Sequence, residues 1–314
     1  MPDNFRTLVV VNPKSAGGTV EKKWTEIART IADNFGPFEH RHTKAPGDAA
    51  RVAREGIAEG FELIVALGGD GTISEVANGF FEDGKAIGNA ALGVLPFGTG
   101  GDFRKTMLIS KELAASARAL RGRKTRMIDC GRLDLNRPGG GRETRYFVNI
   151  ASFGIAGLVD ELVNTSSKAL GGRASFLIAT LRAQLSYQNQ RVRLVLDDGE
   201  PEELLINNVA VSNGQYFGGG MHIAPNAEVD DGLFDVVTLG DFSPLELVLH
   251  GMRIYKGTHL TLPKVKVRRA AKVEAWPVTP GDEVRLDVDG ETPGALPALF
   301  TCLPQVLPFK VNES

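Results

Sequence analysis

The sequence is poor in cysteine: Cys130 and Cys302 are the only two in 314 residues. They show no CxxC spacing, which argues against a disulfide framework and predicts free structural thiols in a reducing compartment. An excess of either charge is also lacking, because 36 Lys plus Arg balance 38 Asp plus Glu for a net charge of -2. We therefore expect no nucleic acid partner.

Long hydrophobic runs are missing as well. The apolar run that ends before Pro13 is too short for a signal-peptide core or a membrane span. We therefore expect a cytoplasmic protein that contacts membranes at most peripherally. The five histidines show no HExxH or comparable spacing, so none is assigned to a metal or to catalysis.

The length predicts two domains. Residues 1–130 alternate continuous apolar strands, at 7–11, 63–67 and 91–95, with amphipathic helices, the first of them running through Asn34. Strands of this kind are typical of a parallel sheet that helices cover on both faces. This pattern predicts a doubly wound, mostly parallel α/β domain.

The pattern of apolar and polar residues changes after residue 130. From 131 to 300, short alternating segments and Asp-Gly or Asn-Gly turns indicate antiparallel strands. Helical patterns interrupt them near 155–170, 173–187 and 244–255. We expect a β-rich substrate domain of the sandwich type.

Three glycine-rich turns, at 12–18, 68–72 and 98–102, follow the predicted parallel strands. Such turns meet at one edge of a doubly wound sheet, so we expect them to converge around a ligand. One turn alone could be a tight connection that requires positive φ, but three, two of them with an aspartate, favour a binding site. The Walker A pattern is absent, and GxGxxG is only approximated.

Asp70, in the middle of the LGGDGT turn, is an unexpected neighbour for phosphate. Two unit charges 4 Å apart repel by about 4 kcal/mol at an effective dielectric near 20. The carboxylate fits if the ligand arrives with Mg²⁺, or if Asp70 takes a proton from an attacking hydroxyl. Either role indicates phosphoryl transfer.

The motifs NPKSAGG, GGDGT, PFGTGGDF, FGGGMHIAPNAEVDDGLFDV and DVDGE occur in this order along the chain. The sequence thereby resembles the diacylglycerol kinase catalytic-domain family of bacterial lipid kinases, relatives of sphingosine kinases. GGDGT is shared with NAD kinases and phosphofructokinases, and the distal motifs favour the lipid kinase branch. The resemblance implies an NAD kinase/diacylglycerol kinase-like fold, use of ATP and Mg²⁺, and a C-terminal strand, about 301–314, that returns to the first domain.

The resemblance also implies roles for individual residues. Asp70 and Glu291 would be catalytic carboxylates, and Asp102 and Asp129 would join a Mg²⁺ network. Asp231, with the backbone carbonyls of Glu228 and Leu233, would hold a structural Mg²⁺. The nucleotide would contact Asn12, Ser15, Gly17, Thr43, Gly68, Gly69, Gly71, Thr72, Gly98, Thr99 and Gly100.

Plainer interpretations stay open at this stage. Asp289-Gly290 fits a hairpin turn with Glu291 as its exposed neighbour, and Asp129 could cap a loop. Asp231-Gly232 equally fits an ordinary turn.

Two residues depart from the family pattern. Gly101 stands where asparagine is usual, which removes an amide that could contribute about 1 kcal/mol. Ala16 stands where glycine is frequent.

A basic strand pattern places Lys264, Lys266 and Arg268 on one face. It could contact anionic headgroups or be a solvated face.

We expect an ATP-dependent lipid kinase that phosphorylates a hydroxyl of a diacylglycerol-like lipid at a membrane surface. A kinase for a soluble acceptor such as NAD, or a nucleotide-binding regulator without turnover, are the alternatives. The identity of the lipid and a homodimeric state are left open.

Overall fold

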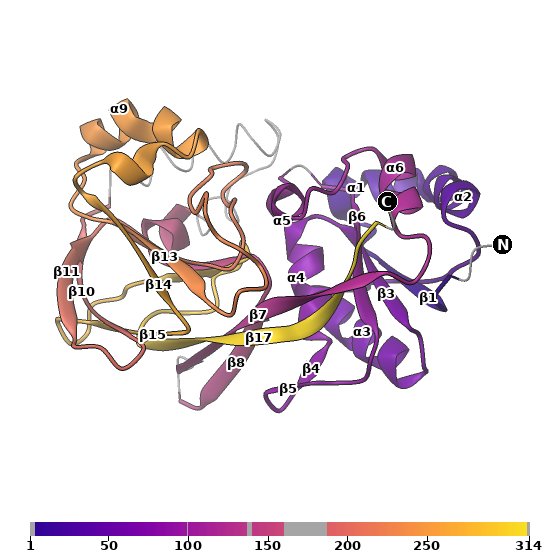
Figure 1. Ribbon diagram of the computed structural model, residues 1–314, viewed down its shortest axis with the longest axis horizontal. Helices are drawn as coiled ribbons and strands as arrows, with labels where there is room; N and C mark the ends of the chain where they lie inside the picture. The colour runs from indigo at the N-terminus through magenta and orange to yellow at the C-terminus, as the bar shows by residue number, and fades with distance from the viewer. Residues whose placement is uncertain (1–3, 99, 137–139, 160–186, 313–314) are drawn as a thin grey trace. The chain divides into compact units, whose positions relative to one another are not determined.

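The computed structural model describes residues 4–98, 100–136, 140–159 and 187–312. The chain divides into two compact units, one formed by residues 1–129 with 305–314 and the other by residues 130–304 (Figure 1).

Unit 1 contains a parallel sheet in the order β2-β1-β3-β6-β17. Its strands are β1 (Thr7–Val11), β2 (Glu39–His42), β3 (Leu63–Gly68), β6 (Ala91–Pro96) and the end of β17 (Ala298–Lys310). β1 and β3 are buried along their whole length, as expected for a sheet covered on both faces. Phe309 of β17 pairs with Leu92 of β6, so the last strand extends this sheet.

Helices cover both faces of the sheet. They are α1 (Ser15–Lys22), α2 (Trp24–Asn34), α3 (Asp48–Ala58), α4 (Asp70–Asn78), α5 (Asp102–Thr106) and α6 (Leu113–Ala119), with a small hairpin of β4 (Phe81–Glu82) and β5 (Lys85–Ala86). α2 and α6 pack on the face that carries Val9 and Val65. α3 and α4 pack against each other and on β1 and β3, with Gly56 of α3 against Leu8 of the opposite face.

The helix expected through Asn34 is divided in two. Lys23, with φ -112° and ψ 16°, leaves the helical region and separates α1 from α2. Ile27 and Ile31 are nevertheless buried, as their helical spacing predicts. The break changes the element without changing the face that packs on the sheet.

Unit 2 is an antiparallel sandwich, which confirms the predicted fold class. One layer contains β7 (Thr125–Asn136), β8 (Arg142–Phe147), β10 (Gln190–Leu196), β11 (Glu202–Ile206), β15 (Lys272–Pro277) and β17. The other has the order β14 (Val265–Ala270), β13 (Phe234–Leu239), β12 (Asn208–Ser212), β9 (Ile150–Gly154) and β16 (Leu286–Val288).

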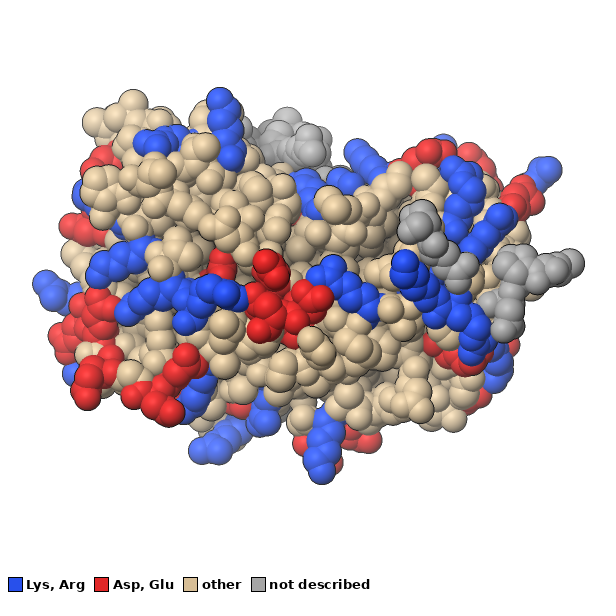
Figure 2. Space-filling view, viewed as in Figure 1, with Lys and Arg blue, Asp and Glu red and all other residues tan. Residues whose placement is uncertain are grey.

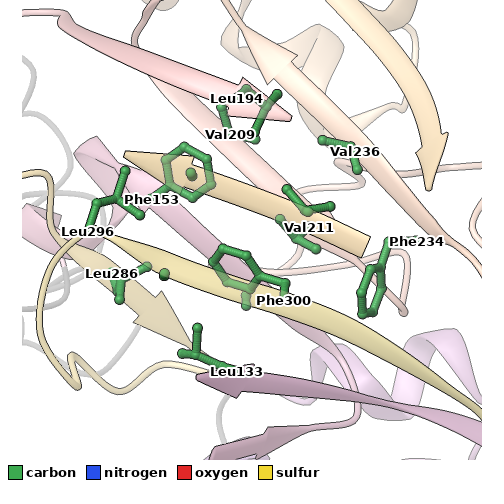
Figure 3. Close-up of a cluster of buried hydrophobic side chains, with 14 of the residues drawn as sticks. Leu133, Phe153, Leu194, Val209, Val211, Phe234, Val236, Leu286, Leu296 and Phe300 are labelled. Carbon is green, nitrogen blue, oxygen red and sulfur yellow. The ribbon is translucent and has the colours of Figure 1, made fainter. Parts of the chain in front are cut away.

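The core of unit 2 lies between these layers (Figure 3). Phe153 of β9 stacks on Phe300 of β17 with ring centroids 6.0 Å apart, and Phe147 stacks on Phe234 at 5.5 Å. Rings from opposite sheets therefore interdigitate, which fixes the spacing of the layers.

The outer face of the β13–β12 layer is covered by α9 (Pro244–Tyr255) and the 3₁₀ turn η2 (His259–Thr261). α9 spans the range that the sequence predicts. Ser243 caps it: its hydroxyl accepts from the Glu246 N–H, and Glu246 accepts from the Ser243 N–H. The helices expected at 155–170 and 173–187 lie largely outside the described residues. Within the described part of the chain, no helix has the length and apolar character needed to cross a membrane.

Candidate active site

The first glycine turn is tied to the second. Asn12 follows β1, its amide nitrogen donates to Thr72 Oγ1 at 3.0 Å, and its Oδ1 accepts from the Lys14 N–H. Its backbone N–H donates to the Leu67 carbonyl. Asn12 and Thr72, 60 residues apart, are thus brought together at the carboxyl ends of β1 and β3.

Three consecutive residues of the first turn are left-handed. The φ angles of Ala16, Gly17 and Gly18 are 51°, 67° and 83°. A Cβ on Gly17 or Gly18 would meet nothing, so the backbone angle and not crowding favours glycine there. Ser15 is buried at the start of the same turn. The turn exposes its backbone to a ligand without a side chain in the way.

The second and third turns touch each other. A Cβ on Gly98 would lie 2.7 Å from the Gly69 Cα, so the two backbones pass at a distance that only glycine permits. The Phe97 N–H also donates to the Gly68 carbonyl at 2.7 Å. A Cβ on Gly71 would meet nothing, which leaves open space beside this turn. Thr99 lies outside the described residues.

Asp70 is held by the third turn. Its Oδ2 accepts from the N–H groups of Gly101 at 2.8 Å and Asp102 at 3.2 Å. Its Oδ1 accepts from the Phe103 N–H at 3.1 Å. These N–H groups begin α5, where helical N–H groups have no intrahelical partner. Gly100 leaves room for the carboxylate, because a Cβ there would lie 3.0 Å from Oδ2.

The pKa of Asp70 is raised. Burial is the main cause, the negative charge of Asp102 adds to it, and the three backbone hydrogen bonds oppose it without cancelling it. Asp102 is itself buried and pairs with Lys105 at 2.8 Å. The second and third turns therefore concentrate negative charge where a cation would be stabilised.

A cavity of about 140 Å³ lies beside the first two turns. Its lining includes Asn12, Thr43, Thr72 and Glu75. Thr43 is placed there by its N–H, which extends the β1 pairing to the Val11 carbonyl. Three residues expected to contact nucleotide thus share one cavity.

Asp129 is fully buried in unit 1. Its Oδ1 accepts from the Gln305 N–H at 2.7 Å, across 176 residues of sequence. It therefore fastens β17 beside β7, which is the kind of backbone bond that the plainer interpretation anticipated. Its place in a Mg²⁺ network stays a prediction.

Glu291 lies in unit 2 at the end of a tight hairpin. Asp289 and Gly290 have φ of 50° and 89°, and Val288 and Glu291 exchange backbone hydrogen bonds across them. The Glu291 carboxylate is 45% exposed and pairs with Arg145 at 2.8 Å. It is accessible to a substrate and oriented by a cation, and its catalytic role stays a prediction.

Asp231 is already engaged by protein groups. Its Oδ1 accepts from the Leu233 N–H, and its Oδ2 contacts the Arg269 guanidinium. A Mg²⁺ ion here, with the carbonyls of Glu228 and Leu233, would require Arg269 to release the carboxylate. Within the described ranges, no three His, Cys, Asp or Glu side chains form a group that could hold a metal by themselves.

Two polar residues near Glu291 were not singled out as functional by the sequence. Asp289 accepts from the N–H groups of Val148 and Ile150, so it ties the hairpin to the residues before β9. Asn149, between them, donates to the Tyr216 carbonyl, and its buried Oδ1 has no hydrogen-bond partner. A buried asparagine is informative only once the fold shows its neighbours, and the sequence carries no separate signal for it.

A mostly parallel α/β sheet with an antiparallel β-sandwich defines the NAD kinase-like fold class. Residues 6–133 match the model of the diacylglycerol kinase catalytic domain, and residues 149–311 match that of the YegS C-terminal NAD kinase beta sandwich-like domain. The chain therefore belongs to the diacylglycerol kinase catalytic-domain family, as the motifs predict.

Individual proteins of this family are similar to the chain along most of its length. The chain is 27% identical to a diacylglycerol kinase of Bacillus subtilis over 301 residues, 95% of this chain and 93% of that protein. It is 32% identical to a "Probable lipid kinase YegS-like" protein of Pseudomonas aeruginosa over 237 residues, 76% of this chain and 73% of the other. A crystal structure of a diacylglycerol kinase from Bacillus anthracis, 21% identical, has the same fold, with a TM-score of 0.69 over 100% of this chain and 99% of that one.

Proposed function

We propose that the protein transfers the γ-phosphoryl group of ATP to a hydroxyl group of a lipid. The observation that supports this most is the connection of the second glycine turn to both others, to the first through Asn12 and Thr72 and to the third through the Asp70 carboxylate, in a chain of the diacylglycerol kinase family. Open glycine backbone at the ends of parallel strands suits phosphate oxygens. The acceptor class follows from the relatives and not from the turns, so it is the part that needs testing.

The nucleotide would bind along the three turns. Asn12, Thr43 and Thr72 line the cavity beside them and would contact one end of the nucleotide. The remaining proposed contacts, along the phosphates, are Ser15, Gly17, Gly68, Gly69, Gly71, Gly98, Thr99 and Gly100.

Mg²⁺ fits the donor set at the second and third turns. Asp70 and Asp102 are close enough for the charge of one to raise the pKa of the other. Mg²⁺ binds through one or two carboxylates together with phosphate oxygens, so these two aspartates would hold the metal with ATP once Lys105 releases Asp102, and Asp129 would support them. When bound, the ion neutralises charge on the phosphates.

In the reaction, the lipid hydroxyl oxygen forms a bond to the γ-phosphorus. The bond between that phosphorus and the oxygen bridging to the β-phosphate breaks, and ADP leaves. We assign the hydroxyl proton to the Glu291 carboxylate, which Arg145 orients.

The test is a transfer assay with pure protein, Mg²⁺, γ-labelled ATP and a total lipid extract. We expect a labelled lipid with the wild type, none with Asp70→Asn, and normal labelling with Asp83→Asn, an exposed aspartate in the β4–β5 turn. Label that enters only a soluble acceptor such as NAD would contradict the lipid proposal. ATP that raises the melting temperature without any transfer would contradict catalysis itself.

A further inference from the structure

Helix α9 exposes apolar side chains on its outward face. These are Leu245 (68% exposed), Val248 (62%), Leu249 (68%), Met252 (64%) and Tyr255 (44%). Their spacing of three, four, seven and ten residues from the first places them in one stripe along the helix. On the other side, Leu247 and Ile254 are buried against the sheet.

This arrangement is unusual for a surface helix. Such a helix normally turns a polar face to solvent once its apolar face is packed. α9 is apolar on both faces, and in Figure 2 the surface over it, at the upper left, is mostly tan with blue side chains at its margin. The stripe is small, but five exposed apolar side chains on one helix are a candidate interaction surface.

Basic residues lie at the C-terminal end of the stripe. Lys256 is exposed there, and the guanidinium of Arg253 donates to the Thr258 carbonyl and to Thr261 Oγ1, while Asp241 is exposed before the other end of the helix. The one acidic residue of α9, Glu246, is bound by Lys264 and Ser243, which lower its pKa to about 2. Glu246 therefore stays ionised and paired, and the helix presents a cation, Lys256, that can reach an anionic partner.

The basic residues of β14 and the preceding Lys264, noted in the sequence, are less available to an anionic partner because they form ion pairs within the protein. Lys266 and Arg268 both pair with Glu202 at 2.7–2.8 Å, and Lys264 pairs with Glu246. These partners favour the solvated-face interpretation of β14, because two carboxylates neutralise two of these three positive charges. The apolar stripe of α9 has a basic residue of its own, Lys256, exposed at its end.

We propose that the outward face of α9 docks on an anionic lipid bilayer. The apolar side chains enter the boundary between headgroups and acyl chains, while the exposed Lys256 reaches the headgroups. Tyr255, with an apolar ring and a polar hydroxyl, suits that boundary. The inference rests on the proposed function, because it supplies the route to a substrate that lies in the bilayer.

The size of the stripe favours a bilayer over a second copy of the chain. Twelve residues of helix are about 18 Å long, and a stripe about 10 Å wide covers roughly 200 Å². A stable protein interface buries about 800 Å² per partner. An amphipathic helix alone is sufficient for interfacial binding when cations and anionic lipids assist it.

The test measures binding to vesicles without nucleotide. The wild type should sediment with vesicles of equimolar phosphatidylcholine and phosphatidylglycerol. Leu249→Gln and Met252→Gln should each weaken this binding about tenfold, which corresponds to about 1.4 kcal/mol. Met127→Gln, a 40% exposed methionine of unit 1, is the matched control and should bind as the wild type does.

The charge contribution is measured separately. Lys256→Gln should weaken binding to anionic vesicles about fivefold and leave binding to pure phosphatidylcholine unchanged. Equal vesicle binding by the wild type and the Leu249→Gln, Met252→Gln double variant would overturn the inference. So would a dimer in sedimentation velocity that the double variant abolishes, because a second copy would then cover the stripe.

A transfer assay separates this inference from the proposed function. The double variant should phosphorylate a short-chain diacylglycerol in free solution at the wild-type rate and long-chain diacylglycerol in vesicles more slowly. Loss of both activities in the variant would overturn the docking role. A wild type that binds vesicles and transfers label to no lipid of a total extract would refute the kinase proposal while supporting the docking surface.

Discussion

Replacing Asp70 with asparagine should abolish activity, and it should cost less folding stability at neutral pH than in acid. The wild-type carboxylate accepts three backbone N–H bonds, yet burial and the charge of Asp102 still raise its pKa above 3.8. Ionised Asp70 is therefore less favourable in the folded chain than in the unfolded chain. Each unit by which the pKa is raised corresponds to about 1.4 kcal/mol.

The sign of the effect sets its pH dependence. Because the folded-state pKa is the higher one, the stabilising contribution of Asp70 is complete below its unfolded pKa and is lost as pH rises through the folded value. The carboxamide has nearly the shape of the protonated acid, but its NH2 group cannot accept the Phe103 N–H, so Asp70→Asn loses about one hydrogen bond, about 1 kcal/mol. Asp70→Asn should therefore be the less stable protein in acid, and the difference in the free energy of unfolding should shrink as the pH approaches 7, where the wild-type carboxylate is ionised and buried.

Urea unfolding of both proteins between pH 3 and pH 8 measures this difference directly, using about 1–3 kcal/mol per molar urea as the expected slope. Titrating groups that do not interact with Asp70 cancel in the comparison. Asp83→Asn, at an exposed turn position, should give a curve parallel to that of the wild type. A stability difference that does not shrink between acid and neutral pH would refute the reasoning, because burial would then not disfavour the ionised carboxylate.

Two further substitutions test the first turn and the hairpin. Ala16→Gly should raise the free energy of unfolding by about 1 kcal/mol, since alanine at φ 51° has a left-handed backbone that glycine adopts without strain. Ala32→Gly, at an exposed position in the last turn of α2, should lower it by about 0.5–1 kcal/mol, and thermal denaturation that gives both variants the same sign would contradict the argument. Glu291→Gln should lower the maximal transfer rate roughly 10²-fold if the carboxylate accepts the proton, with little effect on the KM for ATP. An unchanged rate would leave Glu291 as a turn residue.

The sequence predicts the fold class because both sheet types leave a local signature. Parallel strands buried on both faces read as continuous apolar runs, as in 63–67, and the antiparallel strands alternate between Asp-Gly turns. The helix at Pro244–Tyr255 has a proline at its first position after a serine cap, which fixes its start. The break at Lys23 has no such signal, because the apolar spacing continues across it.

The sequence indicates which residues belong to the candidate site, but it does not indicate the groups to which they form hydrogen bonds or ion pairs. Asp70 stands out within its turn, but its bonds to the third turn depend on how β3 and β6 pair. Arg145 and Glu291 are 146 residues apart, and no local pattern connects them. No local pattern connects Asp231 to Arg269 either, because their contact follows from the pairing of β13 with β14. Contacts of this kind require the register of the sheet.

Gly101 illustrates how the structure changes the meaning of a sequence difference. At a position where the family usually has asparagine, the missing amide suggests a weaker nucleotide site. Here Gly101 has φ 67° and ψ 47°, a left-handed conformation that glycine and asparagine adopt more readily than other residues. Its contact with Asp70 is made by the backbone N–H, which either residue supplies. The substitution therefore preserves the turn and the bond that holds Asp70, and any cost is confined to contacts that the asparagine side chain would make.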